Sequence, residues 1–482
     1  MALFDAMRLG TVALDALAAT QARPQDIAAR QADRLAQLLE AATRGSQLYS
    51  DLYRRHLRGR KAADVLLSDL PRVGKATLMQ RFDDWVTDPS LKLPALRAFT
   101  ADTQRVGESF LGRYLVWESS GTSGEPGMFV QDARALAVYD ALEAVRRRSP
   151  VPQQRWLDPM LLNERTAFVG VIGGHFTSYV SVQRLRRLNP WVARALRSFS
   201  IMQPTSQLVE ALNAYLPTII ATYPTAAALL ADETRRGRLR IAPREVWTGG
   251  ETLSSPVQHW IEQTWGCSVR NTYGASEFLS IGSQCERGRL HANADWVILE
   301  PVDEHNRPVP AGKRSHSTLL TNLANHVQPV IRYELGDQVT VSPQRCECGS
   351  PLPVIDVQGR RDDALVMEGR DGQPVTLLPL ALTAVLEDTA GVFDFQLRQI
   401  DARTLVLRLA LPAAEARAAT ARCCKALQAF ARQQGLKPIE VIEELGQPVP
   451  RGRSGKLRRV VGLADPVAAS SSPHAPLRGS VR

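Results

Sequence analysis

Short apolar segments alternate with longer helix-like segments from about residue 166 onward, and this alternation constrains the fold more than any other feature of the sequence. Residues 168–172 and 218–221 are apolar runs with the length and composition of strands buried on both faces. A turn and a helix-like segment follow each run. Because strands that alternate with helices form a parallel sheet covered by helices, the sequence predicts an α/β fold with a doubly wound sheet.

One predicted helix in this region leads directly to a candidate ligand site. The helix begins near Ser254, with a serine N-cap and an early proline, and ends near Gly266. Residues 267–272 then have the composition of a strand. The sequence Tyr-Gly-Ala-Ser-Glu at 273–277 therefore falls at the C-terminal end of a strand, where α/β sheets bind ligands.

The character of the sequence changes at about residue 364, where shorter strands and helices alternate. Helices are predicted over 379–388 and 413–434, and a period-2 strand over 404–409. Near the N-terminus, residues 24–57 predict an amphipathic helix. A tail rich in Ala, Ser and Pro is expected to be disordered. The predicted division is a large N-terminal domain, a small α+β domain and a disordered tail, at 1–363, 364–462 and 463–482.

Composition excludes several classes of protein. The chain has 482 residues, 44% hydrophobic and 22% charged, which is close to the globular average. Six of the ten excess positive charges lie in residues 451–482, so the basic balance does not indicate nucleic-acid binding. No apolar stretch is long enough to span a membrane, and charged residues interrupt the apolar N-terminus, which argues against a signal peptide. A cytoplasmic location without a disulfide framework is expected.

A loop rich in glycine and hydroxyl groups is the first candidate for nucleotide chemistry. Residues 118–127 contain three glycines and four hydroxyl side chains, so backbone N–H groups and hydroxyls can approach phosphate oxygens closely. The loop lacks the Gly-Lys-Ser/Thr ending of a Walker A motif. Taken alone, such a segment is more often a flexible connection.

Further motifs follow this loop in a fixed order. They are Gly249-Gly250-Glu251, the segment 273–277, Tyr-Glu-Leu-Gly-Asp at 333–337, Gly-Arg-Arg-Asp-Asp at 359–363 and Arg-Ser-Gly-Lys at 453–456. Together they resemble the adenylate-forming superfamily of acyl-CoA synthetases, luciferases and peptide-synthetase adenylation domains. The resemblance covers about 20–462 and is most specific to the phenylacetate-CoA ligase-like branch. Glu125 and Glu334-Leu335 depart from the residues most common in that branch.

The resemblance implies roles for residues of the large domain. Glu277 would hold Mg²⁺, Tyr273 would flank adenine beside Gly274, and Asp337 would accept hydrogen bonds from the ribose hydroxyls of ATP. The loop Gly249, Gly250 and Glu251 would lie on the adenine side. The phosphate loop would comprise Ser119, Ser120, Gly121, Thr122, Ser123 and Gly124, with Thr122 among the catalytic residues.

The resemblance also implies a small, mobile C-terminal domain. Arg360 would contact ribose, Asp362 would be the hinge between the domains, and the thiol arm would pass beside Gly369. Lys456 would neutralise charge as the substrate carboxylate attacks the α-phosphate. Without the preceding Ser-Gly, a lysine in a basic tail would be interpreted as solvated.

Two residues are candidates for the acid-binding pocket. His175 and Phe176 follow a Gly-Gly pair, at the position where relatives carry residues of the acyl pocket. A lone histidine is more often structural, and that alternative stays open.

Three cysteines and one histidine form a candidate zinc site. Cys285, His291, Cys346 and Cys348 offer three thiolates and one imidazole, which is a complete tetrahedral set for structural Zn²⁺. The glycine after Cys348 permits the tight turn that directs both sulfurs to one metal. Some members of the phenylacetate-CoA ligase-like branch resemble this arrangement. The alternative is four unconnected residues.

These features predict an enzyme that activates a small carboxylic acid, expected to be aromatic, with ATP and Mg²⁺. The acyl-adenylate would then pass its acyl group to a thiol, either of coenzyme A or of the phosphopantetheine arm of an acyl carrier protein. The alternative is a non-catalytic, zinc-stabilised nucleotide-binding protein with the same fold.

Lys456→Ala tests the implied division of labour between the two half-reactions. Formation of acyl-adenylate should slow about 10²–10³-fold, because one electrostatic contact in the transition state is lost. Thioester formation from synthetic acyl-adenylate should be nearly unchanged. Rapid-quench measurement of each half-reaction checks this, and equal slowing of both would contradict it.

Overall fold

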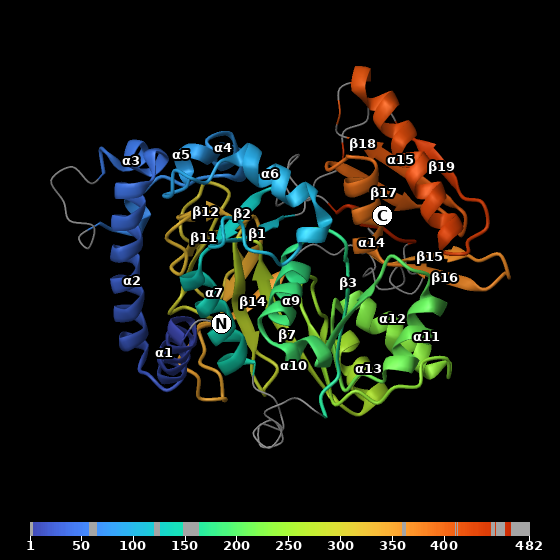
Figure 1. The fold of residues 1–482 in the computed structure, drawn as a ribbon, viewed down its shortest axis with the longest axis horizontal. Coiled ribbons are helices and arrows are strands. Elements are labelled where there is room, and N and C mark those ends of the chain that lie inside the picture. The colour runs from blue at the N-terminus through green and yellow to red at the C-terminus, as the bar shows by residue number, and fades with distance from the viewer. Residues whose placement is uncertain are drawn as a thin grey trace, which may run out of the picture.

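Of the 482 residues, the computed structural model describes residues 3–56, 65–119, 126–147, 163–358, 363–409, 411, 413–444, 449 and 458–463 (Figure 1). The expected disordered tail lies outside these residues except for Leu463. Among the described residues, no helix combines the length and the apolar composition needed to cross a membrane.

A nine-stranded sheet forms the centre of the molecule. Its order is β13 (Gln338–Val341), β14 (Val354–Gln358), β9 (Leu290–Ala292), β8 (Phe278–Gln284), β7 (Ser268–Ala275), β6 (Glu245–Thr248), β5 (Ile219–Thr222), β3 (Thr166–Gly170) and β4 (Leu196–Ser200). The strands from β4 to β7 pair in parallel, as the alternating sequence predicts. From β7 to β13 the pairing is antiparallel, which the sequence did not indicate.

The two faces of the parallel half differ in chemistry. On one face, Ala167, Ile220 and Val246 belong to a buried apolar core. Helices α11 (Thr205–Tyr215), α12 (Pro224–Arg235) and α13 (Ser255–Trp265) complete that core. On the other face, Phe168 and Trp247 line a cavity beneath α7 (Ala133–Arg146) and α9 (Thr177–Leu188). This second face is therefore available to a ligand.

The N-terminal helices cover a second core that includes the buried Trp85, Trp117 and Phe278. The predicted helix over 24–57 is divided at Ser46, whose hydroxyl accepts a hydrogen bond from the Tyr49 amide (3.3 Å) and thereby starts α3. The elements here are α1 (Leu3–Ala19), α2 (Pro24–Gly45), α3 (Gln47–Tyr53), η2 (Leu67–Asp69), α4 (Lys75–Gln80), α5 (Phe82–Trp85), α6 (Leu93–Ala101), η3 (Thr103–Arg105), β1 (Leu115–Glu118), β2 (Met128–Gln131), β10 (Val297–Val302), β11 (Ser317–Asn322) and β12 (Tyr333–Glu334). The short helix α10 (Pro190–Ala195) lies elsewhere, against α9 and β4.

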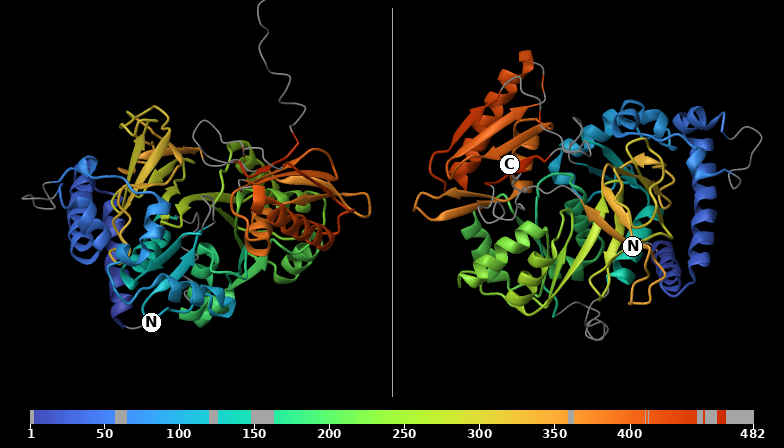
Figure 2. Two further views of the ribbon diagram at one scale, coloured as in Figure 1. Left: turned by 90° about the horizontal axis from the view of Figure 1, so that it is seen from above. Right: turned by 180° about the vertical axis from the view of Figure 1, so that it is seen from behind.

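The elements after residue 363 lie together at one side of the molecule, orange to red in Figures 1 and 2. The predicted strand and long helix are present, whereas the predicted helix over 379–388 continues beyond Ala384 as a π-helical turn. A hydrogen bond from Gln434 Nε2 to the Met202 carbonyl (2.7 Å) joins this region to the segment before α11. The elements are β15 (Leu365–Glu368), β16 (Pro374–Leu377), α14 (Pro379–Ala384), η4 (Val385–Thr389), β17 (Phe395–Gln399), β18 (Thr404–Leu409), α15 (Ala413–Gln433), β19 (Glu440–Glu443) and β20 (Val460–Val461).

A buried ionic network anchors α7, which carries part of the cavity wall. The Arg146 guanidinium makes two hydrogen bonds of 2.7 Å to the Asp295 carboxylate and one of 2.8 Å to Asn293 Oδ1. Asp295 is 0% exposed, and Arg34 of α2 approaches the same carboxylate (3.7 Å). The end of α7 is thereby fixed to both α2 and the turn before β10.

Arg146→Met should lower the free energy of unfolding by about 3–5 kcal/mol, because it leaves the Asp295 carboxylate with far weaker compensation in the interior. Urea denaturation measures the change. The matched control is Arg44→Met, which removes an exposed partner of Glu40 and should change stability by less than about 1 kcal/mol. Equal effects of the two substitutions would contradict the structural role assigned to Arg146.

Candidate functional site

A cavity of about 2110 Å³ lies at the C-terminal ends of β5, β6 and β7. The C-terminal region contributes Pro379, Thr383 and Arg459 to its wall. Many predicted site residues, distant in sequence, meet in this one cavity: Ser119, Gly249, Gly250, Glu251, Tyr273, Gly274, Glu277 and Asp337.

The other residues predicted for the nucleotide site are not among the described residues that line the cavity. Most of the phosphate loop, the ribose arginine, the hinge and the lysine lie outside the described residues: Ser120, Gly121, Thr122, Ser123, Gly124, Arg360, Asp362 and Lys456. Gly369 is described, in the turn between β15 and β16, but it does not line the cavity. A Cβ there would lie 2.7 Å from the Gln373 carbonyl oxygen, so the turn requires glycine.

The ends of the phosphate loop are held together by main-chain and side-chain bonds. The Ser119 amide donates to the Gly127 carbonyl (2.8 Å), and the Gly127 amide donates to Ser119 Oγ (2.9 Å). A Cβ at Gly127 would lie 3.1 Å from Lys75 Cε. The Lys75 side chain therefore passes directly beside the closed base of the loop.

A tight hairpin positions Glu277. β7 extends to Ala275, three residues further than predicted, and Glu277 occupies the turn into β8. A Cβ at Gly274 would lie 2.0 Å from the Leu279 carbonyl oxygen, so only glycine allows this close approach. The Ser276 hydroxyl is 3.0 Å from Thr177 Oγ1 of α9, which fixes the turn against the cavity wall.

Two carboxylates in the cavity are each paired with a tyrosine hydroxyl. Tyr273 donates to Asp337 Oδ2 (2.7 Å), and Tyr333 is hydrogen-bonded to the Glu277 side chain. Burial raises the pKa of Glu277, and the nearby Lys75 ammonium opposes that shift. Carboxylate oxygens beside a cavity are ligands that a hard cation such as Mg²⁺ prefers, so Glu277 has the chemistry required of an Mg²⁺ ligand.

Lys75 is a site residue that the sequence analysis missed. It is the first residue of α4, it lines the cavity, and it lies close to both Gly127 and Glu277. No motif surrounds it in the sequence. Only the tertiary fold brings its side chain beside Gly127 and near Glu277.

The adenine-side loop is held by Glu251. Its two carboxylate oxygens accept hydrogen bonds from the amide and the hydroxyl of Thr225, both 3.0 Å long. Gly250 has a positive φ of 78°, which a residue with a side chain rarely adopts. These contacts fix the loop against the start of α12.

The two predicted pocket residues lie elsewhere. Neither His175 nor Phe176 lines the cavity. The His175 ring is buried, 5.5 Å from the Phe99 ring, and burial lowers its pKa. The His175 carbonyl accepts a hydrogen bond from the Glu118 amide (2.8 Å), which ties this segment to the end of β1. Residues of α7 and α9 line the cavity instead.

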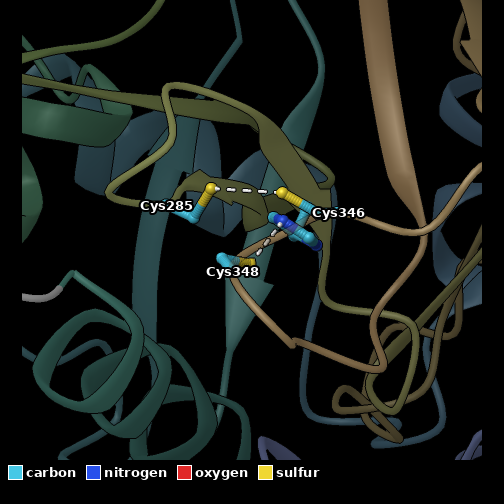
Figure 3. A group of neighbouring side chains, drawn as sticks. Cys285, Cys346 and Cys348 are labelled. Carbon is cyan, nitrogen blue, oxygen red and sulfur yellow. Dashed lines mark hydrogen bonds between the residues drawn. The ribbon is translucent and has the colours of Figure 1, made fainter.

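The predicted zinc ligands converge at the antiparallel end of the large sheet (Figure 3). Their ligand atoms all lie within 4.8 Å of one another, with Cys285 Sγ 3.8 Å from Cys346 Sγ and Cys348 Sγ 3.4 Å from His291 Nε2. Bonds of about 2.3 Å at tetrahedral angles would separate two zinc-bound sulfurs by about 3.8 Å. His291 Nδ1 contacts the Leu352 carbonyl (2.9 Å), which leaves Nε2 directed to the metal position. The donor set fits Zn²⁺.

Comparisons with known proteins agree with this geometry. The family model described as AMP-binding enzyme matches residues 195–314. The phenylacetate-coenzyme A ligase of Thermus thermophilus is 28% identical over 193 residues, 38% of this chain and 42% of that protein. A crystal structure of 2-hydroxyisobutyryl-CoA ligase, bound to its acyl-adenylate and CoA, matches with a TM-score of 0.56 over 92% of this chain and 91% of that chain, at 20% identity. Residues 195–314 thus match the AMP-binding enzyme family, and the fold of the chain is that of an adenylate-forming enzyme.

These similarities are more informative about the fold of this chain than about its substrate. Protein CapK of Staphylococcus aureus is 24% identical over 214 residues, 42% of this chain and 44% of that protein. Each of these two curated relatives is thus matched over less than half of its length. At 20% identity, the similarity to 2-hydroxyisobutyryl-CoA ligase establishes the two-domain α/β architecture.

Cys348→Ser should lower zinc content and thermal stability together, because metal binding and folding share one free energy. Elemental analysis and thermal denaturation measure the two effects. Cys424→Ser, on α15 and outside the cluster, is the matched control and should leave zinc content unchanged. Absence of stoichiometric zinc from the carefully purified wild-type protein would contradict the predicted site.

Proposed function

We propose that this protein activates a carboxylic acid with ATP and Mg²⁺ and transfers the acyl group to a thiol. The observation that carries the proposal is that the described residues of the ordered motifs meet in one cavity, where Glu277 and Asp337 are each hydrogen-bonded to a tyrosine. A carboxylate oxygen of the acid attacks the α-phosphorus of ATP, and the bond to the β-phosphate breaks to release pyrophosphate. The thiol sulfur then attacks the acyl carbon and releases AMP.

Three of the described residues have separate proposed roles in the first step. Asp337, held by Tyr273, would orient the ribose through its carboxylate oxygens. Lys75 would neutralise charge on the phosphates beside Ser119, because its side chain lies at the base of the phosphate loop. Glu277 would hold Mg²⁺, which supplies further charge neutralisation when bound.

The C-terminal region would complete the site. Arg459 lines the cavity, and its guanidinium is fixed by Glu387 at 2.6 Å. Lys456 is only three residues before Arg459, which supports the proposed role of Lys456 at the α-phosphate. We also propose that the large domain ends at residue 363 and that the small domain begins at residue 364. The small domain would rotate about Asp362, and the thiol arm would pass beside Gly369.

Coenzyme A is the proposed acceptor, because the relatives that support the proposal include two CoA ligases. An aromatic acid is the proposed substrate, because Phe168 and Trp247 lie in the cavity beneath α7 and α9. A carrier-protein phosphopantetheine presents the same thiol. Separate assays with CoA and with a phosphopantetheinylated carrier protein distinguish the two acceptors.

ATP–pyrophosphate exchange with a panel of aromatic and aliphatic acids tests the central proposal. Acid-dependent exchange supports acyl-adenylate formation. Tight ATP binding without exchange for any acid would favour the alternative of a non-catalytic nucleotide-binding protein.

Glu277→Gln should reduce exchange about 10²-fold or more, because the amide keeps the shape of the side chain but loses the charge that attracts Mg²⁺. The fold should persist, as checked by circular dichroism. Glu210→Gln, at an exposed position of α11, is the matched control and should exchange like the wild type. Wild-type exchange by Glu277→Gln would remove Glu277 from the metal site.

A further inference from the structure

The floor of the acid side of the cavity is a row of three side chains on neighbouring strands. Phe168 of β3 is paired in register with Ala221 of β5, and Ala221 with Trp247 of β6. All three line the cavity. Because adjacent strands are about 4.8 Å apart, the row places two aromatic side chains on either side of a single methyl group. A planar ring can therefore contact the sheet at Ala221.

The roof above this floor is charged. Asp140 of α7 and Arg184 of α9 form a bidentate ion pair, with N–O distances of 2.9 and 2.6 Å. Glu143 pairs with Arg147 at the end of α7, and the Arg147 guanidinium lies over the Trp247 ring, 4.5 Å from its centroid. All four charged residues line the cavity. The acid therefore meets an apolar floor and a roof of two ion pairs.

The Asp140–Arg184 pair lies about two helical turns along α9 from the residue that contacts Ser276. Thr177, at the start of α9, contacts Ser276 beside the predicted Mg²⁺ ligand. Arg184 is seven residues further along the same helix, which corresponds to about 10 Å. A single ring with one substituent bridges a comparable length. The substituent, rather than the carboxylate, would reach the charged roof.

This chemistry discriminates between classes of acid. An alkyl chain would bury methylene groups against charged side chains and remove water from them without replacing its hydrogen bonds. A second carboxylate or an ammonium group would also be disfavoured, since the four charges already neutralise one another. An uncharged hydroxyl or amino group can donate to the carboxylates, and a hydroxyl can also accept from the guanidinium groups.

We propose that the substrate is a single-ring aromatic acid with an uncharged hydroxyl or amino substituent, selected by the ion pairs Asp140–Arg184 and Glu143–Arg147. This inference rests on the proposed function and specifies its acid. It assigns specificity to residues of α7 and α9, which no motif of the superfamily identified.

The test compares acids that differ only in the ring substituent. Exchange is measured with benzoates and phenylacetates that carry a methyl, hydroxyl, amino or carboxylate group at the 3- or 4-position, and with octanoate. For the best ring position, kcat/KM for the hydroxyl or amino acid should exceed that for the methyl acid at least tenfold, because the methyl group removes water from the ion pairs without replacing its hydrogen bonds. The second carboxylate and the alkyl chain should rank below both.

Paired substitutions identify the residues responsible. The double variants Asp140→Leu/Arg184→Met and Glu143→Leu/Arg147→Met each replace an ion pair by apolar side chains of similar size. At least one of them should reduce the hydroxyl-to-methyl ratio tenfold or more. Asp232→Leu/Arg236→Met removes an ion pair from α12, outside the cavity wall, and should keep the wild-type ratio. Thermal denaturation confirms that each variant is folded.

The outcomes separate this inference from the proposed function. Robust exchange in which methyl-substituted or alkyl acids are preferred would overturn the inference and leave the proposed function intact. A hydroxyl preference that persists in both cavity variants would remove the ion pairs as its cause. Absence of exchange with every acid would contradict the proposed function and the inference together.

Discussion

The close approach of two backbone segments at Gly274 is the constraint on which the site depends. No side chain can occupy that position, because a Cβ would lie 2.0 Å from the Leu279 carbonyl oxygen. The approach allows β7 to leave its parallel partner β6 and turn directly into the antiparallel strand β8. Glu277 lies in that turn, so its carboxylate enters the cavity at the point where the sheet changes from parallel to antiparallel.

The parallel half of the sheet could be predicted because its strands are buried on both faces. The apolar runs around Phe168 and Ile220 are typical of such strands, and both are strands of the parallel half. The antiparallel half gave a weaker signal, since β9 has three residues and several strands are only half-buried. The continuation of α14 as a π-helical turn was also missed. There the buried pair of Glu387 with Arg459 joins residues 72 positions apart, which no local pattern reveals.

Residues of one compact motif were expected to lie together, and Tyr273 and Glu277 of that motif both line the cavity. The position of His175 relative to the cavity depends on tertiary packing, which no local pattern in the sequence reveals; its ring lies beside Phe99. Lys75 gave no sequence signal because a single lysine at a helix start is common. The charged roof was equally hidden, since Asp140 and Arg184 meet only when α7 and α9 lie side by side.

The arrangement of β8 and β13 connects the cavity to the cysteines at the other end of these strands. β8 begins directly after Glu277 and ends directly before Cys285, while β13 begins directly after Asp337 and leads to the loop that carries Cys346 and Cys348. Each strand thus joins a carboxylate of the cavity to a cysteine at the opposite end of the sheet. The group of cysteines and the two carboxylates of the cavity are therefore held by the same two strands, so a displacement of either strand would move a carboxylate and a cysteine together.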